Sequence, residues 1–131
     1  MGISWEGNAF DPDCPTRVIL DRIGDKWTVL IIDILESGPL RFNEIRQAIG
    51  GITPKVLTST LRSLAADGLI TREAHAEVPP RVEYRLTDLG RSLREPVSTL
   101  RRWAELNASA ITDSRERDSG PDESRSRRAP R

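Results

Sequence analysis

The sequence predicts a mainly α-helical domain that carries a small β-hairpin, a fold of the α+β class. Apolar residues recur at helical spacing between residues 15 and 66 and again after Thr87. Between these regions the spacing changes to strict alternation in the segment VEYRL, residues 82–86, which is typical of a half-buried strand. At 131 residues the chain is long enough for one domain with a hydrophobic core of its own.

Start and stop signals place two helices at the beginning of this domain. Pro15 suits the first position of a helix and Gly24 suits its end. The apolar side of this first helix consists of Val18, Ile19 and Ile23. A second helix is predicted from Lys26 to about Ser37, where Gly38-Pro39 stops it. Because it is apolar on most sides, we expect it at the centre of the core.

The outline of a helix-turn-helix follows. A short third helix from Phe42 to Ile49 is predicted to end at Gly50-Gly51. Thr53-Pro54 then supplies an N-cap and a first-turn proline for a fourth helix, and Asp67-Gly68 ends it. A short helix, a glycine-containing turn and a longer amphipathic helix are typical of DNA-binding helix-turn-helix units.

The fourth helix carries a polar face with no acidic residue before Asp67. Four side chains make up this polar face: Lys55, Thr58, Ser59 and Arg62. On most amphipathic helices such a face is merely solvated. Here it follows a short helix and a turn, and it precedes a hairpin. The major groove of B-DNA admits one helix, and Arg, Lys and hydroxyl side chains read base edges or contact phosphates there. We therefore interpret the polar face as a DNA-recognition surface.

The hairpin is interpreted as the wing of a winged helix-turn-helix. Residues 69–73 and 82–86 supply its strands, and the two prolines of AHAEVPPR give it an extended tip that ends in Arg81. For Arg81 we weigh equally a contact with DNA and the role of a solvated turn arginine. Three further residues are predicted to contact DNA: Arg41, Thr53 at the N-terminus of the fourth helix, and Arg72 in the wing.

After the hairpin, the sequence predicts two more helices. Thr87 caps a helix from Asp88 to Arg94, and Pro96 should break it and begin a longer helix that reaches about Ala110. An apolar stripe on the longer helix consists of Val97, Leu100, Trp103 and Leu106. From the residues alone, this stripe fits intramolecular packing and a dimer interface equally well.

The last residues are rich in charge, serine, glycine and proline, and from Asp113 onward none is large and apolar. Such a segment buries too little surface to offset its ordering entropy. We therefore divide the chain into an N-terminal arm (1–12), a winged-helix domain with dimerisation helices (13–110) and a disordered charged tail (111–131).

The amino-acid composition excludes several classes of function. Twenty basic and twenty acidic residues balance, so net charge gives no evidence for or against a nucleic-acid partner. The single cysteine excludes a disulfide framework and a cysteine-based zinc site, and no apolar run is long enough for a membrane span. His75 is the only histidine, and phosphate-binding loops, paired-histidine metal motifs and nucleophile elbows are missing. We expect a cytoplasmic protein without catalytic activity, cofactor or metal.

These residues closely resemble the HxlR-type transcriptional regulators, winged-helix proteins related to the MarR type. The resemblance runs from about residue 13 to 106 and rests on many short segments in order: Cys14-Pro15, Gly24-Asp25-Lys26-Trp27, Gly38-Pro39, Arg41-Phe42, Glu44-Ile45, Ile52-Thr53-Pro54, Leu57, Leu61, Asp67-Gly68-Leu69, residues 78–84, Thr87, Leu89 and Gly90. It implies a homodimer held by N- and C-terminal helices, two recognition helices on a pseudo-palindromic operator in double-stranded DNA, and usually repression. It also implies that the apolar stripe is a dimer face.

Two questions stay open at this point. Several members of the family use the cysteine that matches Cys14 to sense oxidants or electrophiles, and a helix N-terminus lowers the pKa of a thiol. The alternative for Cys14 is a small side chain that only caps or packs. The alternative for the whole chain is a winged helix that binds another protein, but the polar face lacks the apolar anchors that such an interface uses.

Overall fold

A computed structural model describes residues 7–119, which fall into two units, residues 7–98 and residues 99–119. The first unit contains the following elements: α1 (Pro15–Ile23), α2 (Lys26–Ile34), the 3-10 turn η1 (Leu35–Ser37), β1 (Leu40–Arg41), α3 (Phe42–Ala48), α4 (Pro54–Ala66), β2 (Ile70–His75), β3 (Arg81–Leu86) and the beginning of α5 (Asp88–Asp118). The second unit is the rest of α5. Among the described residues, no helix is both long enough and apolar enough to cross a lipid bilayer.

The hydrophobic core is built around α2, as its sequence predicts. Ile31 and Ile32 of this helix are completely buried, and so are Ile45 of α3 and Leu57 of α4. Leu61 and Leu64 extend the apolar side of α4 into the same core. The predicted helix-turn-helix is therefore held together by the apolar side of α4, which leaves the opposite side of that helix free.

Two side-chain caps start the central helices where the sequence predicts them. The Thr53 hydroxyl accepts the Val56 backbone N–H at 3.2 Å at the start of α4. The Asp25 carboxylate accepts the backbone N–H groups of Trp27 and Thr28 at the start of α2. At its other end α4 stops at Asp67, because Gly68 adopts a positive φ of 79°.

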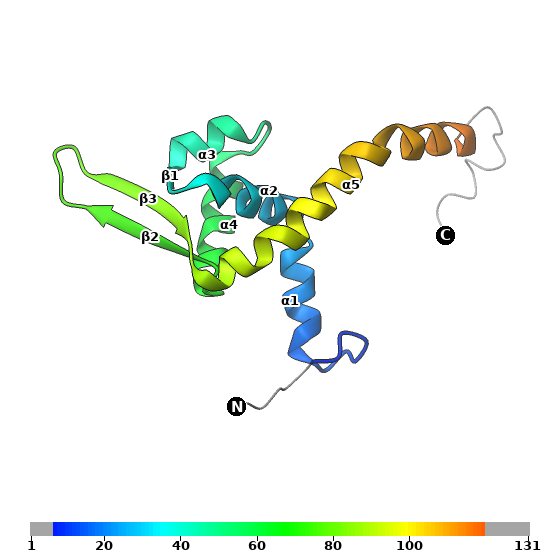
Figure 1. The fold of residues 1–131 in the computed structure, drawn as a ribbon, viewed down its shortest axis with the longest axis horizontal. Coiled ribbons are helices and arrows are strands. Elements are labelled where there is room, and N and C mark those ends of the chain that lie inside the picture. Colours follow the sequence, from blue (N-terminus) through cyan, green and yellow to red (C-terminus); the bar gives the residue numbers. More distant parts are fainter. Residues whose placement is uncertain (1–6, 120–131) are drawn as a thin grey trace. The chain divides into compact units, whose positions relative to one another are not determined.

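A three-stranded antiparallel sheet has the strand order β1-β3-β2, and β2 and β3 extend from the helices as a hairpin (Figure 1). Leu40 pairs with Tyr84 on one side of β3, and Ile70 pairs with Leu86 on the other. The wing is therefore confirmed. β1 was not predicted from the sequence, because two residues are too few to show an alternating pattern.

Gly90, near the start of α5, allows this helix to approach the backbone that links α4 to the wing. It is buried, and a Cβ atom at this position would overlap the Leu69 carbonyl oxygen. The Thr87 hydroxyl joins the same two segments, since it donates to the Gly68 carbonyl oxygen and accepts the Gly90 backbone N–H. These contacts fix the base of the wing against the end of α4.

The structure corrects two expectations about α5. Pro96 lies inside one continuous helix and does not break it. A proline removes one backbone hydrogen bond, but burial of Val97 beside it anchors the helix to the core. The prediction of disorder from residue 111 is wrong for residues 111–118, which are helical. No glycine or proline lies between Pro96 and Gly120, and the Arg and Glu residues of this segment favour helix. Residues 120–131 of the predicted tail lie outside the described residues, as do residues 1–6 of the predicted arm.

The predicted apolar stripe of α5 is only partly available for a dimer interface. Val97 is 4% exposed and belongs to the core of the first unit, so its assignment to a dimer face is wrong. In contrast, Leu100, Trp103 and Leu106 are exposed, with Leu106 at 82%. On α1, Val18, Ile19 and Leu20 are exposed as well, each by more than half of its surface.

Candidate nucleic-acid interface

The polar face of α4 lines one shallow groove on the surface. Pro54 and Ser63 complete the lining of this groove, so all six lining residues are neutral or basic. Lys55, Ser59 and Arg62 are exposed, and Thr58 is half-buried. The sequence prediction thus becomes one continuous surface that can donate hydrogen bonds and that contains no acidic side chain.

Arg72 lies next to this surface. Side chains alternate between the two faces of the hairpin, and Arg72 shares its face with the core residue Ile70 and with its cross-strand partner Tyr84. Arg62, Arg72 and Tyr84 line a second depression, between α4 and the sheet, together with Thr58. The fold therefore brings a wing arginine to the base of the polar face, although the two are ten residues apart in the sequence.

Arg81 lies on the other face of the hairpin. Its guanidinium is ion-paired with Glu77 at 2.9 Å and with Glu83 at 3.4 Å, and its side chain is 30% exposed. These contacts engage both terminal nitrogens of the guanidinium, from which a phosphate would otherwise accept hydrogen bonds, and the remaining Nε is buried. Of the two alternatives for Arg81, the geometry supports a structural role at the wing tip better than a free contact with DNA.

The remaining two predicted contacts each precede one helix of the helix-turn-helix, Arg41 before α3 and Thr53 before α4. Arg41 is exposed in β1 and pairs with Glu83 of β3. Its backbone N–H donates to the Glu44 carboxylate at 2.7 Å, which fixes the start of α3. The Thr53 hydroxyl acts as the cap of α4, so its first role is to set the direction in which α4 begins.

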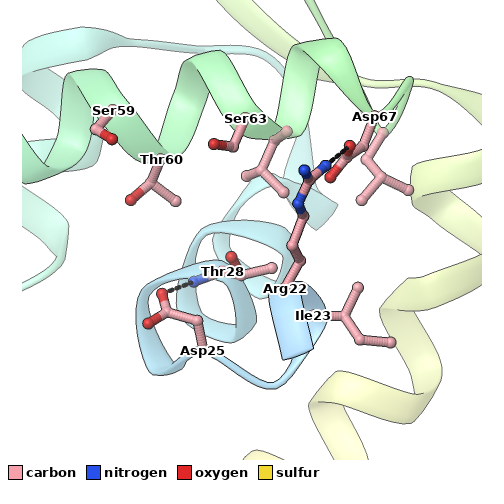
Figure 2. Close-up of a pocket in the computed structure, with 10 residues that line it drawn as sticks. Arg22, Ile23, Asp25, Thr28, Ser59, Thr60, Ser63 and Asp67 are labelled. Atoms are coloured by element: carbon pink, nitrogen blue, oxygen red, sulfur yellow. Dashed lines mark hydrogen bonds and ion pairs between the residues drawn. The ribbon is translucent and has the colours of Figure 1, made fainter. Parts of the chain in front are cut away.

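The side of α4 that carries Ser59 and Ser63 also borders a small cavity of about 150 Å³, next to the groove of the polar face. Figure 2 shows Arg22 reaching from α1 to Asp67, with which it forms an ion pair at the end of α4. Ser59, Thr60 and Ser63 face the same cavity from α4. Because Arg22 is the penultimate residue of α1, this ion pair connects α1 directly to the C-terminal cap of α4. The sequence does not reveal this pair, since its members are 45 residues apart.

Cys14 is the N-cap residue of α1, at the opposite end of that helix from Arg22. Its thiol donates to the Thr16 hydroxyl oxygen at 3.3 Å, and its sulfur accepts the Asn8 backbone N–H at the same distance. Three groups hold the pKa of the Cys14 thiol below its ordinary value because they donate to its thiolate: the Thr16 hydroxyl, which reverses its hydrogen bond when the thiol ionises, the Asn8 backbone N–H and the Thr16 backbone N–H. Partial desolvation opposes them. The sequence predicts a lowered pKa for Cys14 from its position at a helix N-terminus. The structure adds two donors that the sequence does not indicate, the Thr16 hydroxyl and the Asn8 backbone N–H of the preceding turn.

The HxlR-like helix-turn-helix family matches residues 22–112, which include the polar face, the wing and most of α5. The chain belongs to this family. It is therefore a transcriptional regulator with a DNA-binding winged helix, as its sequence predicts.

Relatives and solved structures agree with this assignment. The HTH-type transcriptional regulator YtfH of Escherichia coli (strain K12) is 44% identical over 102 residues, which are 78% of this chain and 81% of the relative. The structure of the transcriptional regulator ytfH from Salmonella typhimurium superposes with a TM-score of 0.78 at 40% identity and covers 85% of this chain and 99% of its own. The redox regulator HypR in its oxidized form has a TM-score of 0.67 at 44% identity and covers 72% of this chain and 97% of its own.

The outer face of the wing holds a cluster that sequence reasoning missed. Glu73 and His75 of β2 lie beside Glu83 of β3, because the hairpin register brings positions 73 and 83 opposite each other. Because Glu83 is separated from Glu73 and His75 in the sequence, their proximity in the fold is not evident from the sequence. An alternating pattern on both sides of a short tip is the one signal that places the three residues on the same face.

Proposed function

We propose that this HxlR-like protein is a dimeric repressor that inserts α4 into the major groove of a pseudo-palindromic operator. The observation that carries the proposal is the groove formed by the polar face, whose exposed Lys55 and Arg62 flank the hydroxyls of Thr58 and Ser59. Arg62 is assigned to a guanine and Lys55 to a phosphate or a guanine, while the hydroxyls reach bases or phosphates. The proposal includes no catalytic role, and it places the protein in the cytoplasm.

Around this centre we assign supporting contacts. Arg72 adds a basic side chain beside Arg62, so it is assigned to the phosphate backbone next to the groove. Arg41, just before α3, and Thr53, just before α4, are assigned to phosphates. Arg81 is retained as a weaker contact, because DNA would first have to displace Glu77 or Glu83 from it.

The dimer is assigned to exposed apolar residues on two helices. Val18, Ile19 and Leu20 of α1 and Leu100, Trp103 and Leu106 of α5 present large apolar side chains to solvent. Exposed apolar residues in such number are typical of an interaction surface. A two-fold dimer places its recognition helices about 34 Å apart, one turn of duplex, which matches two half-sites of an operator.

Cys14 is proposed as the sensor of an oxidant or electrophile. Two relatives support this assignment: HypR is a redox regulator, and YodB from B. subtilis has a diamide-treated structure that is 32% identical with a TM-score of 0.62. The lowered pKa favours the thiolate, which is the nucleophilic form. The chain has one cysteine, so an oxidised Cys14 sulfur would form a disulfide with the partner subunit's Cys14 or with a small thiol, whereas an electrophile would alkylate the Cys14 thiolate directly.

The proposed route from sensor to DNA is α1 itself. Cys14 begins this nine-residue helix, and Arg22 near its end holds Asp67 at the end of α4. A shift of α1 therefore displaces or breaks the ion pair to Asp67, the C-cap residue of α4. Arg22→Gln should leave operator binding by the reduced protein within a few fold of wild type but weaken its response to oxidation. An unchanged response would reject this route without affecting the sensor assignment.

Operator binding under three conditions tests the function. The DNA upstream of the gene is titrated with reduced protein, diamide-treated protein and diamide-treated Cys14→Ser. We expect specific binding by reduced protein, loss of binding after treatment of wild type, and retained binding by the treated variant. Binding that treatment leaves intact would reject the redox switch and retain the regulator. A lack of specific binding under all conditions would favour a protein partner in place of DNA.

A further inference from the structure

Three metal-binding side chains meet on the outer face of the wing, the face opposite the one that carries Arg72. Glu73, His75 and Glu83 each offer one ligand atom, and these atoms all lie within 4.8 Å of one another. We call them the wing triad. All three are half-buried, and they come from two paired strands, which are more rigid supports for a site than loops.

The distances in the wing triad suit a metal ion. His75 Nε2 and Glu83 Oε1 are 3.2 Å apart. In a tetrahedral zinc site with bonds of about 2.0–2.1 Å, two neighbouring ligand atoms are separated by about 3.3 Å. A hydrogen bond explains the same distance for two groups alone. The third group distinguishes the cluster from a simple pair. The Glu73 ligand atom lies no more than 4.8 Å from the other two ligand atoms. It therefore needs to move closer by at most about 1.5 Å to reach the tetrahedral spacing.

Two arginines on the same face of the hairpin contact the carboxylates. Arg81 Nη1 contacts Oε2 of Glu83 at 3.4 Å, whereas His75 contacts Oε1. Arg85 Nε contacts Oε2 of Glu73 at 3.3 Å. Glu83 therefore presents Oε1 to His75 while Oε2 contacts Arg81. Outer contacts of this kind orient metal ligands in many sites, and they fix the carboxylates before an ion arrives.

The positive charge of these arginines opposes a cation, but it is already partly offset. Glu77 contacts Arg81 at 2.9 Å, closer than Glu83 does, so a third carboxylate shares the charge of that guanidinium. The carboxylates of Glu73 and Glu83 therefore retain part of their negative charge for a ligand. The set of one imidazole nitrogen and two carboxylate oxygens suits divalent first-row transition metals, with zinc as a representative.

We propose that the wing triad binds one divalent transition-metal ion through His75 Nε2 and one oxygen each of Glu73 and Glu83, with water in the remaining positions. The site lies outside the polar face and needs no DNA to form. Its failure would therefore leave the proposed operator binding untouched.

Metal titration of the full chain tests this site. All proteins carry Cys14→Ser, so that the thiol cannot bind the ion. Co²⁺ alone is added as the spectroscopic probe, and Zn²⁺ is used in calorimetry. We expect one equivalent of Zn²⁺ to bind and Co²⁺ to give visible d–d absorption. Because His75 is the only histidine, its imidazole resonances in an NMR spectrum report the site alone, and they should shift when Zn²⁺ is added.

Two variants separate the site from general attraction of cations to the wing. His75→Gln should weaken binding by more than about tenfold, because loss of a direct ligand exceeds the effect of losing an outer contact. Glu77→Gln removes one acidic charge from the same hairpin but no direct ligand, so it should weaken binding much less than His75→Gln does, acting only through Arg81. Far-UV circular dichroism checks that both proteins remain folded.

The opposite results overturn the proposal. Equal Zn²⁺ affinity of the Cys14→Ser protein with and without His75→Gln would make the triad a plain ion-pair network. Unmoved imidazole resonances at saturating Zn²⁺ would lead to the same conclusion. If His75→Gln loses its fold, Glu83→Gln takes its place with the same expectation.

Discussion

Arg62 is the residue of the polar face that is best suited to read a base. It is exposed and lies one helical turn beyond Thr58, and it borders both depressions on the α4 surface. A guanidinium donates two parallel hydrogen bonds to O6 and N7 of a guanine. Arg62→Ala removes both donors and preserves the helix, because alanine is the strongest helix former.

The size of the effect follows from the number of hydrogen bonds lost. One bidentate contact to guanine contributes about 1–3 kcal/mol of discrimination between the right and the wrong base. At 1.4 kcal/mol for each tenfold change, this is a loss of about 5- to 150-fold in the ratio of operator to random-DNA affinity. In a dimer with two recognition helices, the two losses multiply.

Arg72→Ala is the matched control, because it removes the same guanidinium from a position that is assigned to the phosphate backbone beside the polar face. A phosphate contact does not depend on sequence, so its loss should weaken operator and random DNA equally and reduce the salt slope by about 0.9 for each contact. Fluorescence anisotropy with an operator and a scrambled duplex at several salt concentrations measures both quantities. Equal losses on the two duplexes for Arg62→Ala would refute the base contact.

Three further outcomes are expected. Val97→Asp should unfold the domain, since it places an unpaired carboxylate in the core. Leu100→Asp changes an exposed residue, so this variant should stay folded and sediment as a monomer. A dimer of Leu100→Asp would contradict the interface. Gly90→Ala should lower the free energy of unfolding by about 1–3 kcal/mol in denaturant titrations, because the added Cβ overlaps the Leu69 carbonyl oxygen. An unchanged midpoint of the unfolding transition would contradict that contact. Thr16→Val should raise the pKa of the Cys14 thiol toward its ordinary value. Because only the thiolate reacts and its fraction rises with pH, the alkylation rate of this variant should rise at higher pH than that of wild type, and coincident curves would exclude the Thr16 contact.

Local signals account for the part of the fold that the sequence predicts well. The boundaries of α1 and α4 follow from Pro15, Gly24, Thr53-Pro54 and Asp67-Gly68, where backbone geometry depends on one or two adjacent residues. The polar face was also predicted as a set, because helical periodicity alone places its members on one side of α4.

The missed features depend on contacts between distant segments. Pro96 should have ended a helix on local grounds, but burial of Val97 offset the lost hydrogen bond. Because Val97 is buried, it belongs to the core and not to the predicted dimer face. The ion pair between Arg22 and Asp67 and the wing triad arise from tertiary packing and strand register, which no local pattern encodes.

Selection of DNA from a pool of random duplexes tests the central claim most directly, because it requires no knowledge of the target gene. We expect enrichment of one pseudo-palindrome with half-sites about one helical turn apart, bound at least about 1,000-fold more tightly than scrambled DNA. Arg62→Ala should enrich sequences that are no longer constrained at one position of each half-site. Failure of the wild-type protein to enrich any motif at low salt would contradict the claim that α4 reads DNA.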